Sequence, residues 1–533
     1  MIRDDLREAI KEAVIRHFGG ENLPIFSLEI PENREHGDYA TNIALLLGGK
    51  IKKNPREVAE LLSRELESKN WGVSVAGPGF LNFTLSSKTL EKEFGEILKK
   101  KEKYGSGKKK KEKIQVEFIS ANPTGPLTLA NGRGGFLGDA LSNIFEKNGY
   151  SVEREYYVND AGNQVLTLGK SLLAAEDIIP EGDSFYKGSY IKEWASAHKT
   201  IVKKNEQNPM ELGKVAAKDF LKNIRAAIEK KSGIHFDRYT SEDRDIHKKG
   251  LVKKALTLFE EKGFVYEKEG ARWLKTTEFG DDKDRVLITR DSYPTYFLAD
   301  SGHYLETKIR KFDLKINIIG PDHYGYVKRI QAAAEIIGFR GSKIIVTQVI
   351  RLLRGEEEVK MSKRKGEFVT FEDLIDEVGQ DAARYFFLEK SPDTHIDFDL
   401  NLAKERSVKN PVYYVQYAYV RAKSILEKTK KIKHDRNSPN YIEYLCTPEE
   451  CVLIKKLIQL PEIIEDTTKD FHVHRVIRYA HELARLFNTF YEKNRVITDD
   501  PMLTRARIDL DRAVIQVLGL SLDLLGISKP KKM

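Results

Sequence analysis

Residues 114–135 read I-Q-V-E-F-I-S-A-N-P-T-G-P-L-T-L-A-N-G-R-G-G, and their pattern is the clearest indication of the fold class. Its first six residues alternate apolar and polar side chains, which predicts a β-strand. Two prolines and a glycine at 123–126 then predict a loop. Apolar residues next recur at helical spacing until Gly149, and a second alternating segment follows at 152–158.

Strand, loop, helix and strand in this order form a βαβ unit, so the fold class is α/β with a parallel sheet. Ligands of such sheets bind beyond the carboxyl ends of the strands, which places residues 120–131 at the predicted site. Gly132, Gly134 and Gly135 at the helix start would let a phosphate approach backbone N–H groups and the positive end of the helix dipole. The alternative is that these glycines only allow close packing between helix and strand.

The bulk composition indicates a folded protein of several domains. The chain has 533 residues, of which 40% are hydrophobic and 32% charged, so we expect three or four domains. The net charge of +9 suits a polyanionic partner but also fits an ordinary solvated surface. The two cysteines, Cys446 and Cys451, match neither a zinc site nor a redox pair, which predicts a reducing compartment and no structural metal.

Patterns along the chain predict three domains and no membrane segment. The start lacks an apolar signal core and no run of 18 apolar residues occurs, so we expect a cytoplasmic protein. Residues 1–105 have an α+β pattern, and 106–400 alternate strands and helices. A region at about 165–290, richer in Lys, Glu and Gly, is predicted to be inserted in this second domain. Residues 401–533 carry helical apolar stripes and predict an all-α domain.

A second unusual stretch is K-M-S-K-R-K-G at 360–366. Its clustered cations and the hydroxyl of Ser362 suit a triphosphate, because lysines supply point charges and serine supplies a donor. Taken alone, the stretch is equally consistent with a surface loop. Together with a phosphate loop in the same chain, it becomes much more specific.

At this point the sequence resembles class I aminoacyl-tRNA synthetases, and more narrowly the arginyl-tRNA synthetases. The resemblance covers almost the whole chain and implies a Rossmann-type catalytic domain, an N-terminal α+β domain that contacts tRNA and a C-terminal helical domain that binds the anticodon. The matching stretches are G-D-Y-A-T-N-I-A at 37–44, G-P-G-F-L-N-F at 77–83, S-A-N-P-T-G-P-L at 120–127, Y-Y-V-N-D-A-G-N-Q at 156–164, P-T-Y-F-L-A-D at 294–300, K-M-S-K-R-K-G-E-F-V-T at 360–370, D-A-A-R-Y-F-F-L at 381–388 and N-P-V-Y-Y-V-Q-Y-A at 410–418.

The resemblance implies an arginine-tRNA ligase. Such an enzyme activates L-arginine with ATP to arginyl-adenylate and transfers it to the 3′ end of tRNA(Arg). Mg²⁺ is expected with ATP, held mainly by phosphates and waters. The family is unusual in needing bound tRNA for the first step. We expect tRNA(Arg), L-arginine and ATP as partners, no DNA or membrane, and a monomer.

The sequence departs from the family where the family usually reads H-V-G-H, because residues 128–131 read T-L-A-N. Losing a charge-assisted donor costs about 1.5–3 kcal/mol, or roughly ten- to hundredfold in rate if the donor acts only in the transition state. Lys360 and Lys363 are therefore expected to carry more of the phosphate stabilisation. The predicted catalytic residues are Thr128, Asn131, Lys360 and Lys363, and the predicted ATP site comprises Pro126, Leu127, Thr128, Asn131, Gly132, Gly134, Met361, Ser362 and Lys363.

Arginine carries a planar cation with five N–H donors, so its pocket needs carboxylates. The family's pocket positions map onto Glu117, Glu242 and Asp300, which we predict to form the cation pocket. Each could instead be an exposed-face residue or pair with a lysine, and only the combination favours a pocket. The full predicted arginine site comprises Glu117, Ser120, Asn122, Glu242, Tyr296, Asp300 and His323.

Two regions are predicted to contact tRNA. Tyr413, Tyr417 and Arg421 lie in one predicted helix of the C-terminal domain, where aromatic and basic side chains would bind splayed bases. Packing of the helical bundle is the alternative role for these side chains. Phe80 and Asn82 lie where the family reads a D-loop base.

Two rival functions remain open at this stage. The lost histidines favour a non-catalytic tRNA-binding paralogue, although such a protein needs neither the K-M-S-K loop nor an acidic pocket. A class I synthetase for lysine is the second rival. Three pocket carboxylates and the N-terminal domain favour arginine, because a lysine pocket needs fewer in-plane acceptors.

Overall fold

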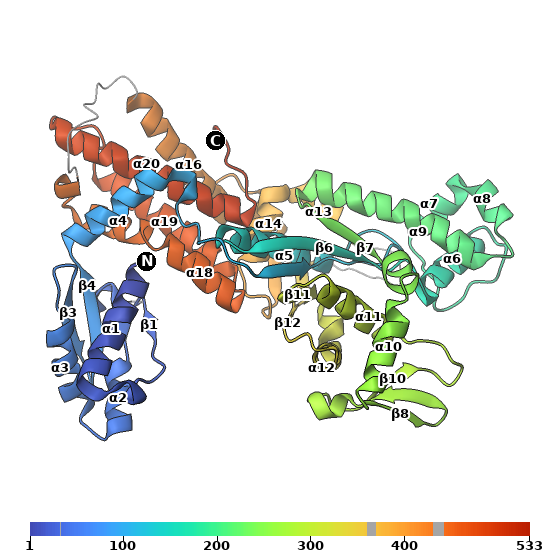
Figure 1. Cartoon of the computed structure of the whole chain (residues 1–533). Coiled ribbons are helices and arrows are strands. Elements are labelled where there is room, and N and C mark those ends of the chain that lie inside the picture. Colours follow the sequence, from blue (N-terminus) through green and yellow to red (C-terminus); the bar gives the residue numbers. More distant parts are fainter. Residues whose placement is uncertain (32, 360–368, 430–441) are drawn as a thin grey trace.

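The computed structural model describes residues 1–31, 33–359, 369–429 and 442–533 (Figure 1). Its central element is a five-stranded sheet in the order β12-β11-β5-β6-β7, with every neighbouring pair parallel. This arrangement confirms the predicted α/β class. The strands are β5 Lys113–Glu117, β6 Ser151–Val158, β7 Arg238–Ser241, β11 Leu314–Ile319 and β12 Ser342–Val346.

The helix predicted after the first loop is α5 (Leu129–Lys147), and it lies against one face of β5. Gly138 packs on the ring of Phe118, where an added Cβ would come within 2.2 Å of the ring. Side chains of a strand alternate between faces, so Gln115 and Glu117 belong to the opposite face. On that face α11 (Tyr296–Ile309) covers the sheet, and the hydroxyl of Thr307 donates to Gln115 Oε1 at 2.9 Å.

The region predicted to be inserted at 165–290 is divided by β7, which is a strand of the central sheet. The part before β7 is a helical lobe with its own apolar core, and the part after β7 contains a small antiparallel sheet (Figure 1). The elements are α6 Asn163–Ala175, α7 Ser189–Ala197, α8 Lys199–Lys204, α9 Pro209–Ala226, α10 Leu251–Glu261, β8 Val265–Lys268, β9 Ala271–Leu274 and β10 Arg285–Ile288.

A second small sheet, in the order β14-β13-β15, leads from the catalytic core to the C-terminal helices. Arg384 on α14 is buried and connects the two parts, because its Nη1 donates to Asp139 on α5 and to the carbonyl oxygen of Leu525 on α20. The remaining elements here are α12 Val327–Ile337, β13 Ile350–Arg354, β14 Glu357–Glu358, α13 Phe371–Val378, α14 Gln380–Leu388, β15 Ile396–Asp399 and α15 Leu400–Lys404.

The C-terminal part is helical in its described residues, as predicted, and it packs on α5 and on the N-terminal region (Figure 1). Its long helices bury one apolar face each, as Leu483 and Phe487 do on α19 and Val514 does on α20. None of the described helices is both long and apolar enough to cross a bilayer. The five helices are α16 Pro411–Thr429, α17 Pro448–Leu457, α18 Leu460–Asp470, α19 His474–Lys493 and α20 Pro501–Leu525.

The N-terminal region contains a four-stranded antiparallel sheet in the order β1-β2-β4-β3 with helices beside it. Arg3 joins this region to α18, since its guanidinium donates to both oxygens of Asp466 at 2.6 and 2.7 Å. The elements are α1 Ile2–Phe18, β1 Leu28–Glu29, β2 Tyr39–Thr41, α2 Ile43–Ile51, α3 Pro55–Leu66, β3 Trp71–Ala76, β4 Phe80–Leu85 and α4 Ser87–Lys100.

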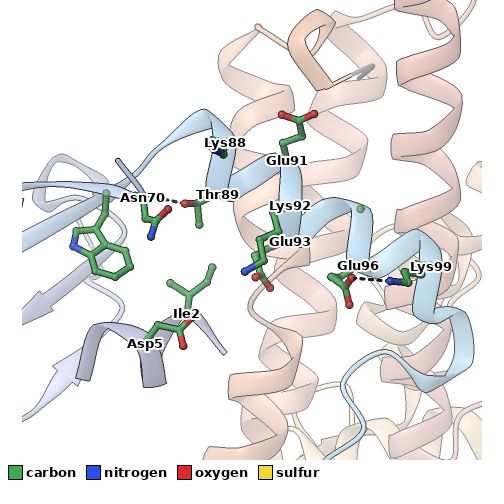
Figure 2. Close-up of a pocket in the computed structure, with 12 residues that line it drawn as sticks. Ile2, Asp5, Asn70, Lys88, Thr89, Glu91, Lys92, Glu93, Glu96 and Lys99 are labelled. Atoms are coloured by element: carbon green, nitrogen blue, oxygen red, sulfur yellow. Dashed lines mark hydrogen bonds and ion pairs between the residues drawn. The ribbon is translucent and has the colours of Figure 1, made fainter. Parts of the chain in front are cut away.

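Helix α4 leaves the N-terminal sheet and lies along the C-terminal helices, where Gln516 on α20 donates to the carbonyl oxygen of Ile97 at 2.6 Å. An open cleft of about 560 Å³ separates the start of α1 from α4 (Figure 2). Lysines and glutamates of α4 alternate along its wall, so the cleft presents no single charge to a ligand. None of its lining residues belongs to the predicted active site.

Candidate active site

The turn after β5 is strained and directs a serine back toward the strand. Ile119 and Ser120 both have positive φ, at 66° and 37°, which side chains other than glycine rarely adopt. In this conformation Ser120 Oγ donates to Glu117 Oε1 at 3.2 Å and accepts the backbone N–H of Tyr157 at 3.1 Å. Ser120 therefore ties the ends of β5 and β6 together beside Glu117.

The two residues that replace the family's histidines bind each other. Thr128 is the N-cap of α5, and its Oγ1 accepts the backbone N–H of Asn131 at 3.4 Å. Asn131 Oδ1 in turn accepts the backbone N–H and the hydroxyl of Thr128, at 3.0 and 2.8 Å. This reciprocal capping box uses the Thr128 hydroxyl proton, so only the amide N–H₂ of Asn131 is left as a side-chain donor of this pair.

Two of the three glycines predicted to admit a phosphate are needed for close packing. Gly132 is buried against the ring of Phe371, and an added Cβ would lie 2.2 Å from that ring. Gly135 is likewise packed on Ile119. An added Cβ at Gly134 would make only an ordinary contact, 3.5 Å from Ile318. The packing alternative therefore accounts for Gly132 and Gly135, and the approach of a phosphate to this helix start stays a prediction.

The described residues that follow the second signature stretch lie next to the first. Lys360, Met361, Ser362 and Lys363 lie outside the described residues. The chain that follows them starts α13, where Phe371 donates its backbone N–H to the carbonyl oxygen of Leu127 at 2.9 Å. This contact and the packing of Phe371 on Gly132 place the start of α13 at the N-terminus of α5. The described chain that follows the second signature thus lies against the first.

A buried lysine is paired with the first predicted carboxylate. Lys315 on β11 has no exposed surface, and its ammonium lies 2.9 Å from Glu117 Oε2 and 3.2 Å from Glu155 Oε2. Burial alone would lower the pKa of Lys315, but the charges of Glu117 and Glu155 outweigh it and raise that pKa. Asn317 Nδ2 also donates to Glu117. Glu117 is therefore held in place before any substrate binds.

The same cluster has the ligand spacing of a metal site but contains a cation of its own. Glu117, Glu155 and His303 each offer a ligand atom within 4.8 Å of the others. The Lys315 ammonium lies between them, 3.1 Å from His303 Nε2. A divalent ion would have to displace this charge, so the residues present do not fit a metal here.

Asp300 on α11 and Tyr326 on the turn η7 (Pro321–Tyr326) form the second part of the pocket. The Tyr326 hydroxyl donates to Asp300 Oδ2. Burial raises the pKa of Asp300 to about 7, the Tyr326 hydrogen bond opposes this rise, and the charges of Glu242 and Glu117 add to it. Glu242 and Glu117 thus lie close enough to Asp300 for the three predicted carboxylates to interact electrostatically.

Glu242 is buried at the start of a π-helical turn, η5 (Glu242–His247), directly after β7. His247 Nε2 lies 3.2 Å from its Oε1, and this hydrogen bond is the largest cause of the raised pKa of His247. Glu242 thus belongs to the edge of the sheet rather than to an insertion remote from it.

The remaining predicted arginine residues lie around this pocket at different depths. Asn122 Oδ1 accepts the side-chain N–H of Asn159 at 2.8 Å, and Tyr296 is 49% exposed one helical turn before Asp300. His323 is exposed, whereas Tyr326 from the same turn reaches Asp300. His323 is a position implied by the family resemblance and stays a prediction, whereas the path of the turn brings its last residue, Tyr326, to Asp300.

The residues predicted to contact tRNA lie on two separate surfaces. Tyr413 and Tyr417 on α16 stack with their ring centroids 6.1 Å apart, and the Arg421 guanidinium lies 4.7 Å from the Tyr417 centroid. On the N-terminal sheet Phe80 is 40% exposed, while Asn82 is buried. The aromatic pair and Phe80 can stack on bases, whereas the Asn82 side chain lies below the surface.

Comparisons with protein families agree along the chain. The model described as tRNA synthetases class I (R), catalytic domain, matches residues 93–425. The Arginyl tRNA synthetase N terminal domain matches residues 1–85, and the DALR anticodon binding domain matches residues 415–533. Residues 86–92, at the start of α4, lie between the N-terminal and the catalytic match.

Full-length relatives and solved structures agree with these domains. The arginine-tRNA ligase of Syntrophotalea carbinolica is 39% identical with both chains fully covered, and that of Listeria monocytogenes is 41% identical over 99% of this chain and 98% of its own. A putative arginyl-tRNA synthetase structure from Campylobacter jejuni is 33% identical, covers 84% of this chain and 100% of its own, and has a TM-score of 0.75. The Thermus thermophilus arginyl-tRNA synthetase, 20% identical with a TM-score of 0.81 over the whole of both chains, shows the same fold. The chain therefore belongs to the arginyl-tRNA synthetase family of class I aminoacyl-tRNA synthetases.

Proposed function

We propose that the site at the carboxyl edge of the central sheet activates L-arginine with ATP and then charges tRNA(Arg). Membership of the family makes the chain an arginine-tRNA ligase. The observation that carries the residue assignment is that Glu117, Glu242 and Asp300 come from three separate elements and interact electrostatically. A cation is what compensates such a concentration of carboxylates.

On the arginine side, Glu242 and Asp300 accept N–H groups of the guanidinium. Glu117 already carries Lys315 and Asn317, so it has less capacity for a second cation and faces the α-ammonium end together with Ser120 and Asn122. Tyr296 closes the exposed rim of the pocket. Tyr326 keeps Asp300 in position until the guanidinium arrives.

On the ATP side, the N-terminus of α5 and the cationic stretch share the phosphates. The helix dipole and the free amide N–H₂ of Asn131 would face the negative charge, and Thr128 orients that amide through the capping box. Lys360, Ser362 and Lys363 add charges and a donor, as in related signatures. Pro126 and Met361 would border the nucleotide, while Leu127, Gly132 and Gly134 shape the backbone beneath it.

The reaction needs positioning and charge stabilisation rather than a protein nucleophile. The arginine carboxylate attacks the α-phosphorus of ATP, a new P–O bond forms and pyrophosphate leaves. The terminal ribose hydroxyl of tRNA then attacks the carbonyl carbon of arginyl-adenylate, and AMP leaves. Mg²⁺ would accompany ATP, held by phosphates and waters, and the residues of the cation pocket take no part in binding it.

One protein chain would contact the tRNA through two separate surfaces. The C-terminal helices offer a stacked aromatic and cationic surface for anticodon bases, formed by Tyr413, Tyr417 and Arg421. This surface is separate from the central sheet. Phe80 offers a second stacking surface on the N-terminal sheet, with Asn82 supporting the strand from below. We propose a monomer, because each part of this site lies within one chain.

Arginine-dependent exchange of pyrophosphate into ATP tests this function. Exchange that requires both arginine and tRNA(Arg) is the expected result. Absence of exchange in a preparation that still binds tRNA would support the non-catalytic paralogue. Exchange supported by lysine instead would refute the pocket assignment.

A further inference from the structure

Tyr157 on β6 is a polar residue of the active-site region to which no role has yet been given. It is 3% exposed, and its hydroxyl has no hydrogen-bond partner in the described part of the chain. A buried polar group without a partner is unfavourable for folding, and such groups are few in native proteins. The hydroxyl therefore needs an explanation outside packing.

The surroundings of Tyr157 hold its ring in one orientation. The ring stacks on His303 with centroids 4.2 Å apart and planes 18° from parallel. It also packs in an apolar cluster with Ile246 and Leu251, and its backbone N–H donates to Ser120 Oγ at 3.1 Å. The hydroxyl thus cannot turn toward another partner without disturbing contacts on three sides.

The charges of four carboxylates act on this hydroxyl. Burial raises the pKa of Tyr157 well above its usual value, and the negative charges of Glu242, Asp300, Glu117 and Glu155 raise it further, in that order of size. Glu117 and Glu155 are paired with Lys315, as described above. The two strongest influences, Glu242 and Asp300, are the carboxylates assigned to the guanidinium.

We propose that Tyr157 is a specificity residue for arginine, whose hydroxyl oxygen accepts an N–H of the substrate guanidinium between Glu242 and Asp300. A guanidinium has five N–H donors in one plane, more than two carboxylates need, and a neutral acceptor adds selectivity without adding charge. The substrate then supplies the hydrogen-bond partner that the Tyr157 hydroxyl lacks in the free protein. This inference rests on the arginine pocket proposed above and adds a residue to it.

The test compares Tyr157→Phe with the unchanged full-length chain in arginine-dependent pyrophosphate exchange with tRNA(Arg). The variant keeps the ring and its stacking on His303, so we expect the KM for arginine to rise about tenfold while kcat and the KM for ATP change less than twofold. Its thermal midpoint should equal or exceed that of the parent, because the hydroxyl that is removed has no partner. An unchanged KM for arginine would overturn the proposal.

A competitive inhibitor identifies the substrate group that the hydroxyl faces. 5-Guanidinopentanoate retains the guanidinium and lacks the α-ammonium group. Its inhibition constant should rise in Tyr157→Phe by the same factor as the KM for arginine. If only the KM for arginine rises, the hydroxyl faces the α-ammonium end and the assignment to the guanidinium is wrong.

Two further variants separate this proposal from the pocket on which it rests. Tyr239→Phe on the neighbouring strand β7 is the matched control, because Tyr239 stacks on Tyr156 rather than on His303 and lies outside the pocket. It should leave the KM for arginine unchanged. Asp300→Asn should raise that KM strongly. If Asp300→Asn and Tyr157→Phe both have no effect, the pocket itself is misplaced, whereas an effect of Asp300→Asn alone refutes only the role of Tyr157.

Discussion

The two ends of the active site are built in opposite ways. At the amino-acid end, buried charges form a dense network in which Lys315, Glu155 and His303 support Glu117. At the phosphate end, Thr128 and Asn131 form a neutral capping box, and most of the donors described there are backbone N–H groups. The comparison suggests that selection of arginine depends on side chains fixed in advance, whereas the phosphate chemistry depends on a helix N-terminus and on the cationic signature stretch.

The strongest test of the preformed network is removal of its central cation. Lys315→Met removes the buried cation that neutralises Glu117 and Glu155, so we expect a loss of about 3–5 kcal/mol in the free energy of unfolding. Chemical denaturation of the catalytic core measures this loss. Lys231→Met is the control, because Lys231 pairs with Asp376 near the surface and should contribute less than about 1 kcal/mol. Similar small losses in both variants would mean that the network is not preformed.

The second prediction concerns the pocket carboxylate on α11. Asp300→Asn removes the charge opposite the guanidinium, which is worth about 1.5–3 kcal/mol and raises the KM for arginine roughly ten- to hundredfold. Steady-state exchange at saturating ATP measures it. Asp243→Asn is the control, since this carboxylate pairs with Lys248 at 2.6 Å beside Glu242 and should leave the KM unchanged. Equal effects of the two variants would indicate a general loss of negative charge.

The pH dependence of arginine binding should reveal the same carboxylate. With a pKa of about 7, Asp300 is mostly protonated at pH 6 and mostly ionised at pH 8, so the KM for arginine should be about tenfold higher at pH 6. Protonation of His247 beside Glu242 would act in the same direction. Asp300→Asn therefore serves as the control. If the KM for arginine of this variant varies with pH as that of the parent does, the effect belongs to His247.

The smallest expected effect concerns the capping box. Thr128→Ala should lower the free energy of unfolding by about 1 kcal/mol and also lower kcat, because the Asn131 amide loses its orientation. Thr447→Ala removes an equivalent capping box, formed with Glu450 on α17, far from the active site. It should cost similar stability and leave kcat unchanged. If Thr128→Ala behaves like Thr447→Ala in both respects, the box at α5 serves the helix only.

The comparison also explains how much the sequence could reveal. Periodicity correctly predicted β5, α5 and β6, because one alternating and one helical pattern dominate that stretch. It did not recognise that β7 divides the inserted region, since four residues with mixed polarity carry little signal. The pocket carboxylates came from motifs, whereas Lys315 and Tyr326 had no local signature. Their roles depend on contacts between distant segments, and the spacing of residues along the chain cannot predict such contacts.

The most direct test of the account measures KM for arginine and kcat side by side in Asp300→Asn and Asn131→Ala. We expect each variant to change a different constant. Asp300→Asn should raise the KM for arginine with little change in kcat, and Asn131→Ala should lower kcat about two- to tenfold with the KM for arginine unchanged. Such a result would assign selection and phosphate chemistry to the two ends of the site. If both variants change the same constant, the proposed division between the two ends is wrong.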